Sequence, residues 1–125
     1  MKGNPVGWFE IYVQDMPRAR KFYEALFDTK LKKLESPTGE LEMWSWEGEQ
    51  GAYGTPGALV KMKDAPSGGL GTLVYFMCED CAVQEAKVPK LGGSIHRRKM
   101  SIGEYGFITL ALDTEGNMIG LHSMK

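Results

Sequence analysis

Apolar and polar positions alternate along Trp8–Gln14, which predicts a strand with two different faces. One face carries Phe9, Ile11 and Val13, and the opposite face carries Trp8, Glu10 and Tyr12. Asp15 follows the strand and is suited to cap a helix, and Pro17 fits the first turn of that helix. Apolar residues then recur at steps of three and four, which predicts an amphipathic helix lying on the Phe9 face. The predicted apolar stripe consists of Ala19, Phe22, Tyr23, Leu26 and Phe27.

The pattern of a strand followed by a helix recurs in the second half of the chain. Leu73–Cys78 repeats the first strand at an offset of 65 residues, counted from Phe9 to Val74. The same offset takes Asp15 to Asp80, which we expect to cap the second helix. Two similar halves in one short chain predict an internal pseudo-dyad.

The second helix is predicted over Ala82–Leu91 and is weaker than the first. Pro89 lacks a backbone N–H and clashes with the preceding turn, so we expect the helix to bend or stop near Val88. Gly92 and its neighbour Gly93 are suited to end it.

Three strand-like segments follow the helix in each half. They are Leu31–Glu35, Leu41–Trp46 and Ala58–Met62 in the first half, and Ser94–Lys99, Phe107–Leu112 and Met118–Ser123 in the second. Lys63–Gly71 is the expected joint between the halves. We therefore predict an α+β fold in a single domain over 1–125, with two βαβββ modules at about 6–66 and 70–125. Their sheets are expected to pair into a cupped, mostly antiparallel sheet with the helices outside.

Composition and charge limit the classes of partner that the chain is expected to bind. The net charge is −1 and no long basic run occurs, which argues against nucleic acid as a partner. No segment approaches the roughly 20 apolar residues of a membrane-spanning helix. The N-terminus lacks the apolar segment of a signal peptide, so the expected location is the cytoplasm. Cys78 and Cys81 form a C-x-x-C pair, but their acidic neighbours oppose a thiolate and favour a structural role.

Three segments resemble a known superfamily. The segment DMPRARKFYEALF after the first strand is similar to its D-x-x-x-A-x-x-F-Y motif, and LGGSI and DTEGNMIGL are similar to its later landmarks. The family is the vicinal oxygen chelate superfamily, which includes glyoxalase I, extradiol dioxygenases, and fosfomycin and bleomycin resistance proteins. The resemblance implies paired βαβββ modules. It also implies a divalent metal in the cup, held by His, Glu or Gln side chains, that polarises vicinal oxygens of the substrate.

The metal-ligand positions that the resemblance implies do not carry metal ligands in this chain. They fall on Trp8, Leu73 and Gly120 and on the segment Gly57–Met62, which contains no Asp, Glu, His or Gln. Trp, Leu and Gly side chains do not coordinate a divalent cation. We therefore expect no metal and no other cofactor, and keep a divalent metal as the alternative.

Glu10 and His122 are the candidate catalytic residues. Each lies two residues from an implied ligand position, Trp8 and Gly120, and so shares its strand face. Such a pair suits general acid–base chemistry, or binding of a polar ligand group. Aromatic and Met side chains in the same predicted cup suit a flat or apolar ligand. The predicted ligand-binding residues are Trp8, Glu10, Tyr12, Trp44, Trp46, Tyr75, Met77 and His122.

Three functions remain open from the sequence. The first is a metal-free module that binds a small, partly aromatic molecule, similar to bleomycin resistance proteins. The second is a lyase- or isomerase-type enzyme, similar to lactoylglutathione lyase, that uses Glu10 and His122 as acid–base groups or metal ligands. The third is a regulatory or interaction module whose cup is filled by its own side chains. The resemblance also allows a homodimer, because these small folds often pair.

Overall fold

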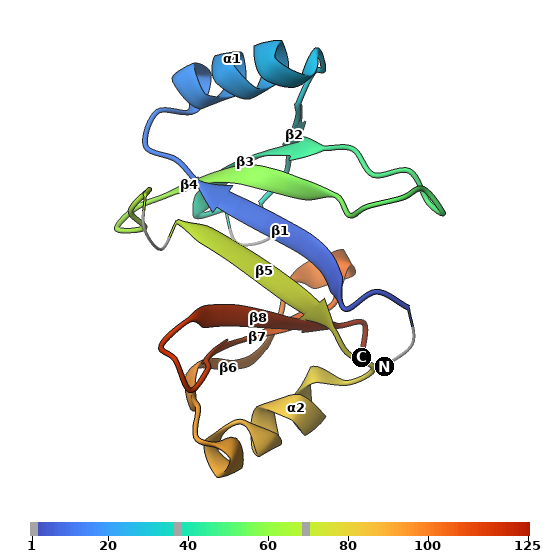
Figure 1. The fold of residues 1–125 in the computed structure, drawn as a ribbon, viewed down its shortest axis with the longest axis vertical. Helices are drawn as coiled ribbons and strands as arrows, with labels where there is room; N and C mark the ends of the chain where they lie inside the picture. The colour runs from blue at the N-terminus through green and yellow to red at the C-terminus, as the bar shows by residue number, and fades with distance from the viewer. Residues whose placement is uncertain (1–2, 37–38, 69–70) are drawn as a thin grey trace. The chain divides into compact units, whose positions relative to one another are not determined.

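The computed structural model describes residues 3–36, 39–68 and 71–125. The chain forms two compact units, which we call the first and second modules. The first module is Trp8–Thr72, and the second is Leu73–Lys125 together with Met1–Gly7. Each half of the chain runs strand, helix and three strands, as predicted from the repeat (Figure 1). The division falls just after the predicted joint.

The boundaries of the elements follow the sequence pattern closely. In the first half they are β1 (Val6–Tyr12), α1 (Met16–Phe27), β2 (Lys32–Leu34), β3 (Leu41–Trp46) and β4 (Gly57–Met62). In the second half they are β5 (Thr72–Met77), α2 (Cys81–Lys87), η1 (Pro89–Leu91), β6 (Ser94–Ser101), η2 (Gly103–Tyr105), β7 (Phe107–Leu112) and β8 (Met118–Ser123). The two η elements are short 3₁₀ helices.

The strands of each module are arranged alike. The first module has the order β2-β3-β4-β1, in which β2–β3 and β3–β4 are antiparallel and β4–β1 is parallel. The second module has the order β6-β7-β8-β5, again with one parallel pair, β8–β5. The α+β class, the βαβββ order and the mostly antiparallel pairing are therefore confirmed.

Helix α1 has a capping residue at each end. A carboxylate oxygen of Asp15 accepts a hydrogen bond from the backbone N–H of Arg18 at 3.0 Å. At the other end Asp28 adopts a left-handed conformation with φ of 50°, which ends the helix. Glu24 then accepts the Leu31 N–H at 2.8 Å and fixes the connection to β2.

The predicted apolar stripe of α1 is only partly correct. Met16 is buried, and Ala19 and Tyr23 are half-buried against the sheet. Phe22, Leu26 and Phe27 instead remain exposed to solvent. They fit the helical spacing, but they lie to the sides of the line that contacts the sheet or at the last turn of the helix.

Helix α2 stops where the sequence predicted. It ends at Lys87, the chain continues as the 3₁₀ helix from Pro89, and Gly92 adopts a positive φ of 97°. Asp80 caps the helix by accepting the Ala82 N–H at 3.0 Å. The predicted stop near Val88 and both predicted caps are confirmed.

The sheet of the first module has an apolar cluster on each face. Leu59 of β4 belongs to the cluster that includes Met16 of α1, so this face is the one that the helix covers. Val60, the next residue, belongs to a separate cluster with Met43 and Ala58.

None of the helices in the described ranges is long and apolar enough to span a membrane.

Candidate functional site

Glu10 lies in the middle of β1, on the sheet face opposite to α1. Its partner in the parallel register is Ala58, while its neighbour Ile11 pairs with Leu59 on the helix-covered face. Glu10 is 7% exposed, and among the residues that the structure describes it is the only charged side chain that is buried. A buried carboxyl on an apolar sheet face is costly, which makes it a candidate for function.

Two donors on the same strand hold the carboxyl group of Glu10. The indole Nε1–H of Trp8 donates to Oε2 at 3.2 Å, and the hydroxyl of Tyr12 donates to Oε1 at 2.7 Å. All three side chains share one face because they alternate along the strand. The structure thus brings together three of the predicted site residues.

Burial raises the pKa of Glu10 above the ordinary carboxyl value of 4.5. The hydrogen bonds from Tyr12 and Trp8 act in the opposite direction, because they stabilise the carboxylate, but they do not outweigh the loss of hydration. The side chain therefore keeps its proton to a higher pH than an exposed glutamate does. It is suited to donate a hydrogen bond, or to exchange a proton, at its apolar face.

The raised pKa makes stability depend on pH in a defined direction. The folded protein binds the Glu10 proton more tightly than the unfolded chain, so this contribution is fully present below 4.5 and is lost as the pH rises through the folded-state pKa. We expect Glu10→Gln to gain stability relative to the native protein as the pH rises above 4.5, measured by urea unfolding. A difference that does not change with pH would contradict this expectation.

The rest of the Glu10 face is apolar. Met43, Ala58 and Val60 are buried on it, and half-buried Trp8 and Tyr12 pack against them together with Leu34 and Leu41. Met43, Ala58 and Val60 could not be predicted as members of this face, because the sequence does not fix the register of β3 and β4. The alternation along β3 places Met43 and Ser45 on one face, but Gly57–Val60 of β4 are all buried, so β4 shows no such alternation.

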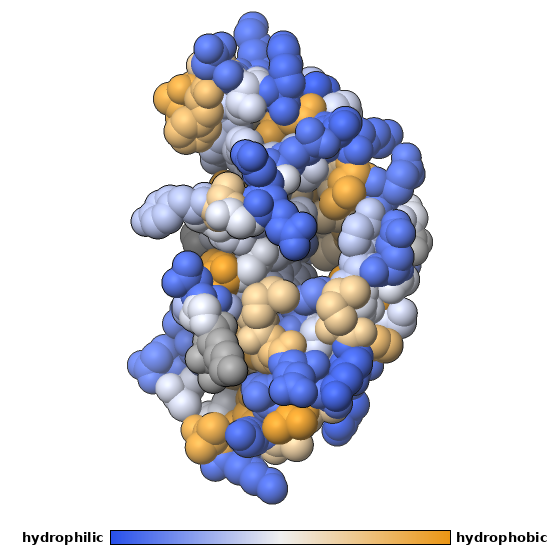
Figure 2. All heavy atoms as spheres, turned by 90° about the vertical axis from the view of Figure 1, so that its right-hand side faces the viewer, coloured by the Kyte–Doolittle hydropathy of each residue, from blue (hydrophilic) through white to orange (hydrophobic). Residues whose placement is uncertain are grey.

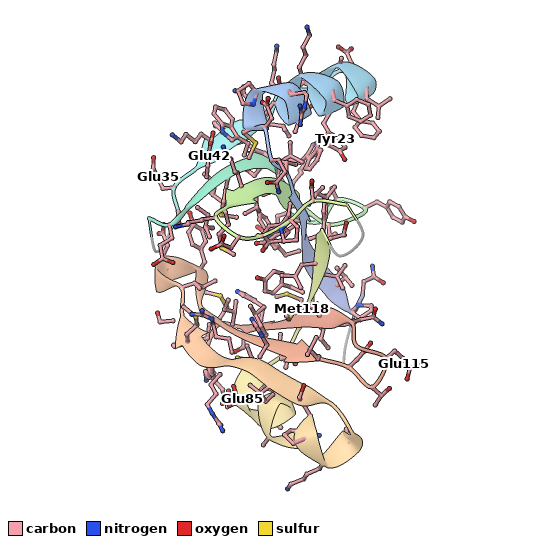
Figure 3. The ribbon with its side chains drawn as sticks, turned by 90° about the vertical axis from the view of Figure 1, so that its left-hand side faces the viewer. Tyr23, Glu35, Glu42, Glu85, Glu115 and Met118 are labelled. Atoms are coloured by element: carbon pink, nitrogen blue, oxygen red, sulfur yellow. The ribbon has the colours of Figure 1, made fainter. Side chains whose placement is uncertain are left out.

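The predicted ligand-binding residues Trp44 and Trp46 lie on the opposite face of the first-module sheet. They pack in the α1 cluster, and Trp46 stacks edge-on against Tyr23 of α1 at 5.6 Å between ring centroids. The Nε1–H of Trp44 donates to Glu42 at 2.9 Å, and Glu42 lies on the α1 side of β3 (Figure 3). The structure therefore does not bring these two tryptophans together with Glu10.

The remaining predicted residues lie on β5 and β8 of the second module. Tyr75 is paired with Gly120, and Met77 is paired with His122. They share a face with Ile108 and Leu110 of β7, which pair with His122 and Gly120. Met118 of β8 has the same strand parity, so this predicted group is also mostly apolar (Figure 3).

His122 has one ring nitrogen engaged and the other buried. Nε2 lies 2.6 Å from the backbone carbonyl oxygen of Tyr105. The carbonyl only accepts, so Nε2 carries the hydrogen, and in a neutral ring Nδ1 is left as an acceptor. Nδ1 is buried and has no hydrogen-bond partner among the described residues. His122 therefore has an unused basic nitrogen.

The residues at the implied metal positions do not fit a divalent metal. A Cβ atom on Gly120 would collide with the ring of Tyr75, so no side chain projects from this position. Trp8 uses its only polar atom to donate to Glu10. Within the described ranges, no three His, Cys, Asp or Glu side chains gather as a metal site.

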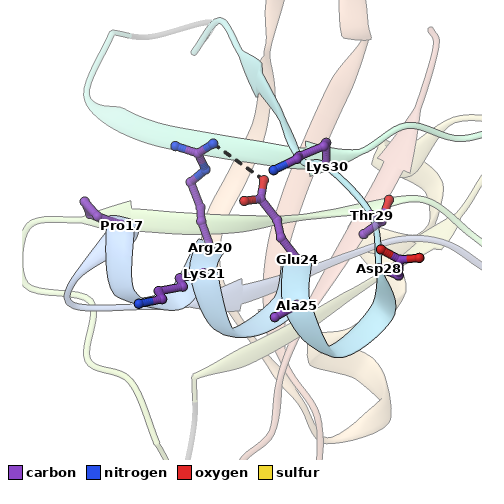
Figure 4. Close-up of a pocket in the computed structure, with 8 residues that line it drawn as sticks. All are labelled: Pro17, Arg20, Lys21, Glu24, Ala25, Asp28, Thr29 and Lys30. Atoms are coloured by element: carbon purple, nitrogen blue, oxygen red, sulfur yellow. Dashed lines mark hydrogen bonds and ion pairs between the residues drawn. The ribbon is translucent and has the colours of Figure 1, made fainter.

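A cavity of about 460 Å³ lies beside α1 and its connection to β2 (Figure 4). Its lining is Pro17, Arg20, Lys21, Glu24, Ala25, Asp28, Thr29 and Lys30. The Leu31 N–H, and then the nearby Arg20 and Lys30 charges, lower the pKa of Glu24. Arg20 in turn stacks on Trp44 at 3.5 Å. Arg20 and Glu24 therefore already make contacts that hold α1 and its connection to β2 in place.

The two cysteines are partly or fully buried. Cys81 is buried at the start of α2, and its N–H donates to Ser123 Oγ at 3.0 Å. Burial raises the pKa of the Cys78 thiol. A raised thiol pKa disfavours the reactive thiolate, which supports the structural role expected from the sequence.

Comparison with known proteins gives a family and a set of similar folds. A family profile described as the Glyoxalase/Bleomycin resistance protein/Dioxygenase superfamily matches residues 6–121. A search of curated protein sequences found no match.

Several solved structures are similar over nearly the whole chain. A Streptomyces coelicolor methylmalonyl-CoA epimerase variant in complex with 2-nitronate-propionyl-CoA has a TM-score of 0.68 at 16% identity, over 96% of both chains. The hypothetical protein BH1468 from Bacillus halodurans C-125 has a TM-score of 0.71 at 13% identity, over 99% of this chain and 96% of that one. At these identities the likeness shows the fold alone.

Proposed function

Because the chain belongs to the glyoxalase/bleomycin resistance protein/dioxygenase superfamily, we propose that it binds a small, partly aromatic molecule without a metal. The observation that carries the proposal is the buried Glu10 carboxyl, held between Trp8 and Tyr12 on an apolar sheet face. The superfamily fold supports a small-molecule ligand. The unsuitable side chains at the implied metal positions support a ligand held by protein groups alone.

The chemistry of this face defines the ligand. Trp8 and Tyr12 offer flat aromatic surfaces, and Met43 offers an adaptable apolar contact. A protonated Glu10 donates one hydrogen bond to a ligand oxygen while it still accepts from Trp8 and Tyr12. An aromatic molecule that carries a carbonyl or phenol oxygen satisfies both requirements.

The test is a fluorescence titration of the native protein with benzoate, acetophenone, naphthol and bleomycin. Trp8 lies on the proposed face, so a bound aromatic ligand should change the tryptophan emission. Glu10→Gln should weaken binding of the best ligand about tenfold, because the NH₂ group of glutamine cannot accept the hydrogen bond that Trp8 or Tyr12 gives to a carboxyl oxygen, and because an amide is a weaker donor than a carboxylic acid.

Glu42→Gln is the matched control. Glu42 also accepts a hydrogen bond from a tryptophan two residues away on its strand, but on the face that α1 covers. We expect this variant to bind like the native protein. Equal loss of affinity in both variants would argue against a site at Glu10.

The second candidate is an enzyme of the lyase or isomerase type, in which Glu10 and His122 act as acid–base groups. The raised pKa of Glu10 and the unpartnered Nδ1 of His122 favour this reading. Methylmalonyl-CoA epimerases are among the similar folds, and one solved complex contains methylmalonyl-CoA itself. An epimerase-like reaction requires removal and return of a proton on carbon.

Deuterium exchange separates the two candidates. The protein is incubated with methylmalonyl-CoA in D₂O, and deuterium in the thioester is followed by mass spectrometry. The binding proposal predicts no exchange above the uncatalysed rate. Exchange that is lost in both Glu10→Gln and His122→Ala would favour the enzyme.

We also propose that the protein is located in the cytoplasm and that it forms a homodimer. The location rests on the sequence expectation and is tested by cell fractionation. The homodimer is given an interface below, from observations that do not depend on the ligand.

A further inference from the structure

Helix α1 exposes three large apolar side chains. Phe22 is 60% exposed, Leu26 is 58% exposed and Phe27 is 61% exposed. Figure 2 shows apolar side chains gathered at the surface over α1. Together they expose roughly 350 Å² of apolar surface, an amount comparable to the largest patch on a typical monomer. A patch of this size is suited to contact another macromolecule.

Apart from the Asp15 carboxylate that caps its N-terminus, the exposed charges of α1 are arranged against the helix dipole. The first turn has no acidic residue and the last turn has no basic residue. Arg18 and Lys21 lie in the N-terminal half, and Asp28 lies at the C-terminal end. A helix dipole favours the reverse arrangement, so these charges do not stabilise the isolated helix.

An antiparallel copy of the same helix complements this arrangement. It places the basic N-terminal half of one helix beside the acidic C-terminal end of the other, and the two dipoles also oppose each other. Lys21 and Asp28 lie on one side of the exposed face, because they are seven residues, about two turns, apart. Phe22 and Leu26 lie on its other side at i and i+4.

We propose that two copies of this chain associate through antiparallel α1 helices. The contact face consists of Arg18, Lys21, Phe22, Ala25, Leu26 and Asp28, and a two-fold axis passes near Ala25. This register brings Phe22 of one protomer to the partner's Leu26, and Lys21 to the partner's Asp28. Ala25 is exposed and small, which allows the helices to approach closely at the axis.

The available area fits a dimer of ordinary size. A standard interface buries about 800 Å² on each partner, with an apolar centre and a polar rim. Phe22, Ala25 and Leu26 supply the apolar centre of such an interface, and the charged side chains supply its rim. The same face on both protomers satisfies the self-complementarity that a two-fold interface requires.

The first test is sedimentation equilibrium of the full chain over a concentration series. The native protein is expected to be a dimer, and Phe22→Glu and Leu26→Glu are each expected to raise the dimer Kd about tenfold or more. Leu91→Glu is the matched control, since Leu91 is 73% exposed on the other module and should leave the Kd unchanged. Circular dichroism checks that each variant is folded. A monomeric native protein, or a dimer that both α1 variants keep, would overturn the proposal.

Charge reversal tests the antiparallel register separately. Lys21→Glu and Asp28→Lys should each weaken the dimer, because each places like charges side by side across the axis. The double variant restores opposite charges and should recover most of the native Kd. Additive weakening in the double variant would overturn the antiparallel arrangement.

Discussion

Substitution of Gly120 by alanine is expected to destabilise the protein by about 1–3 kcal/mol, the usual cost of overpacking a core. The Tyr75 ring occupies the space that a Cβ atom at position 120 would need. Tyr75 is itself only 7% exposed, so its ring has little room to move away. Urea unfolding of the native protein and of Gly120→Ala measures the difference.

A double-mutant cycle shows whether the ring is the cause. Tyr75→Ala alone should be destabilising because it leaves a cavity. In the double variant, however, the added methyl group no longer meets the ring. The loss of unfolding free energy in the double variant should therefore be smaller than the sum of the losses in Gly120→Ala and Tyr75→Ala. Strict additivity would mean that the cost at Gly120 arises elsewhere. The result bears on function, because Gly120 is a position at which the superfamily resemblance implies a metal ligand.

Removal of the Glu85 carboxylate is the second large effect that we expect. Oε1 of Glu85 accepts the backbone N–H of Lys99 at 2.6 Å and the hydroxyl of Thr109 at 2.9 Å. Glu85 projects from α2 toward β6 and β7, and thereby ties the helix to its sheet (Figure 3). Thr109 is fully buried, so without Glu85 its hydroxyl loses a partner in a place that water does not reach.

Glu85→Ala should therefore cost about 2–4 kcal/mol, as expected for two donors that lose a shared acceptor. Glu85→Gln keeps the acceptor oxygen and is expected to cost less than half as much. Arg98 also lies 3.8 Å from Glu85, but its side chain is 85% exposed, so the ion pair adds little. Equal costs for the two variants, measured by urea unfolding, would mean that the charge and not the acceptor matters.

The elements were predictable from the sequence because their signals are local. Asp15 and Asp80 mark both helix starts, and Pro89 marks the end of α2. The alternation of side chains along the first strand also assigned Glu10 to a face different from that of Ile11. The structure has the same two faces on β1.

The position of Trp44 and Trp46 was not predictable in the same way. The alternation along β3 shows that they share a face, but it does not show which face. That choice is set by the pairing of Trp44 with Leu59 of β4, which depends on contacts distant in sequence. The stacking of Arg20 on Trp44 is another contact of this kind, because it joins a helix to a strand.

The exposed side chains of α1 illustrate a different limit. Helical spacing groups Phe22 and Leu26 with the apolar positions of α1. It does not determine how wide a strip of the helix surface the sheet covers. The first-module sheet contacts the line of Met16, Ala19 and Tyr23. Residues beside that line stay exposed unless another surface covers them.

The most direct test of the central claim is the affinity of one aromatic ligand measured with and without metal. The best ligand from the fluorescence panel is titrated into native protein treated with EDTA, and again after addition of Ni²⁺, Zn²⁺, Mn²⁺ or Mg²⁺. We predict the same Kd in every case, weakened by Glu10→Gln but not by Glu42→Gln. Binding that requires one of these metals, with a matching rise in melting temperature, would contradict the metal-free account.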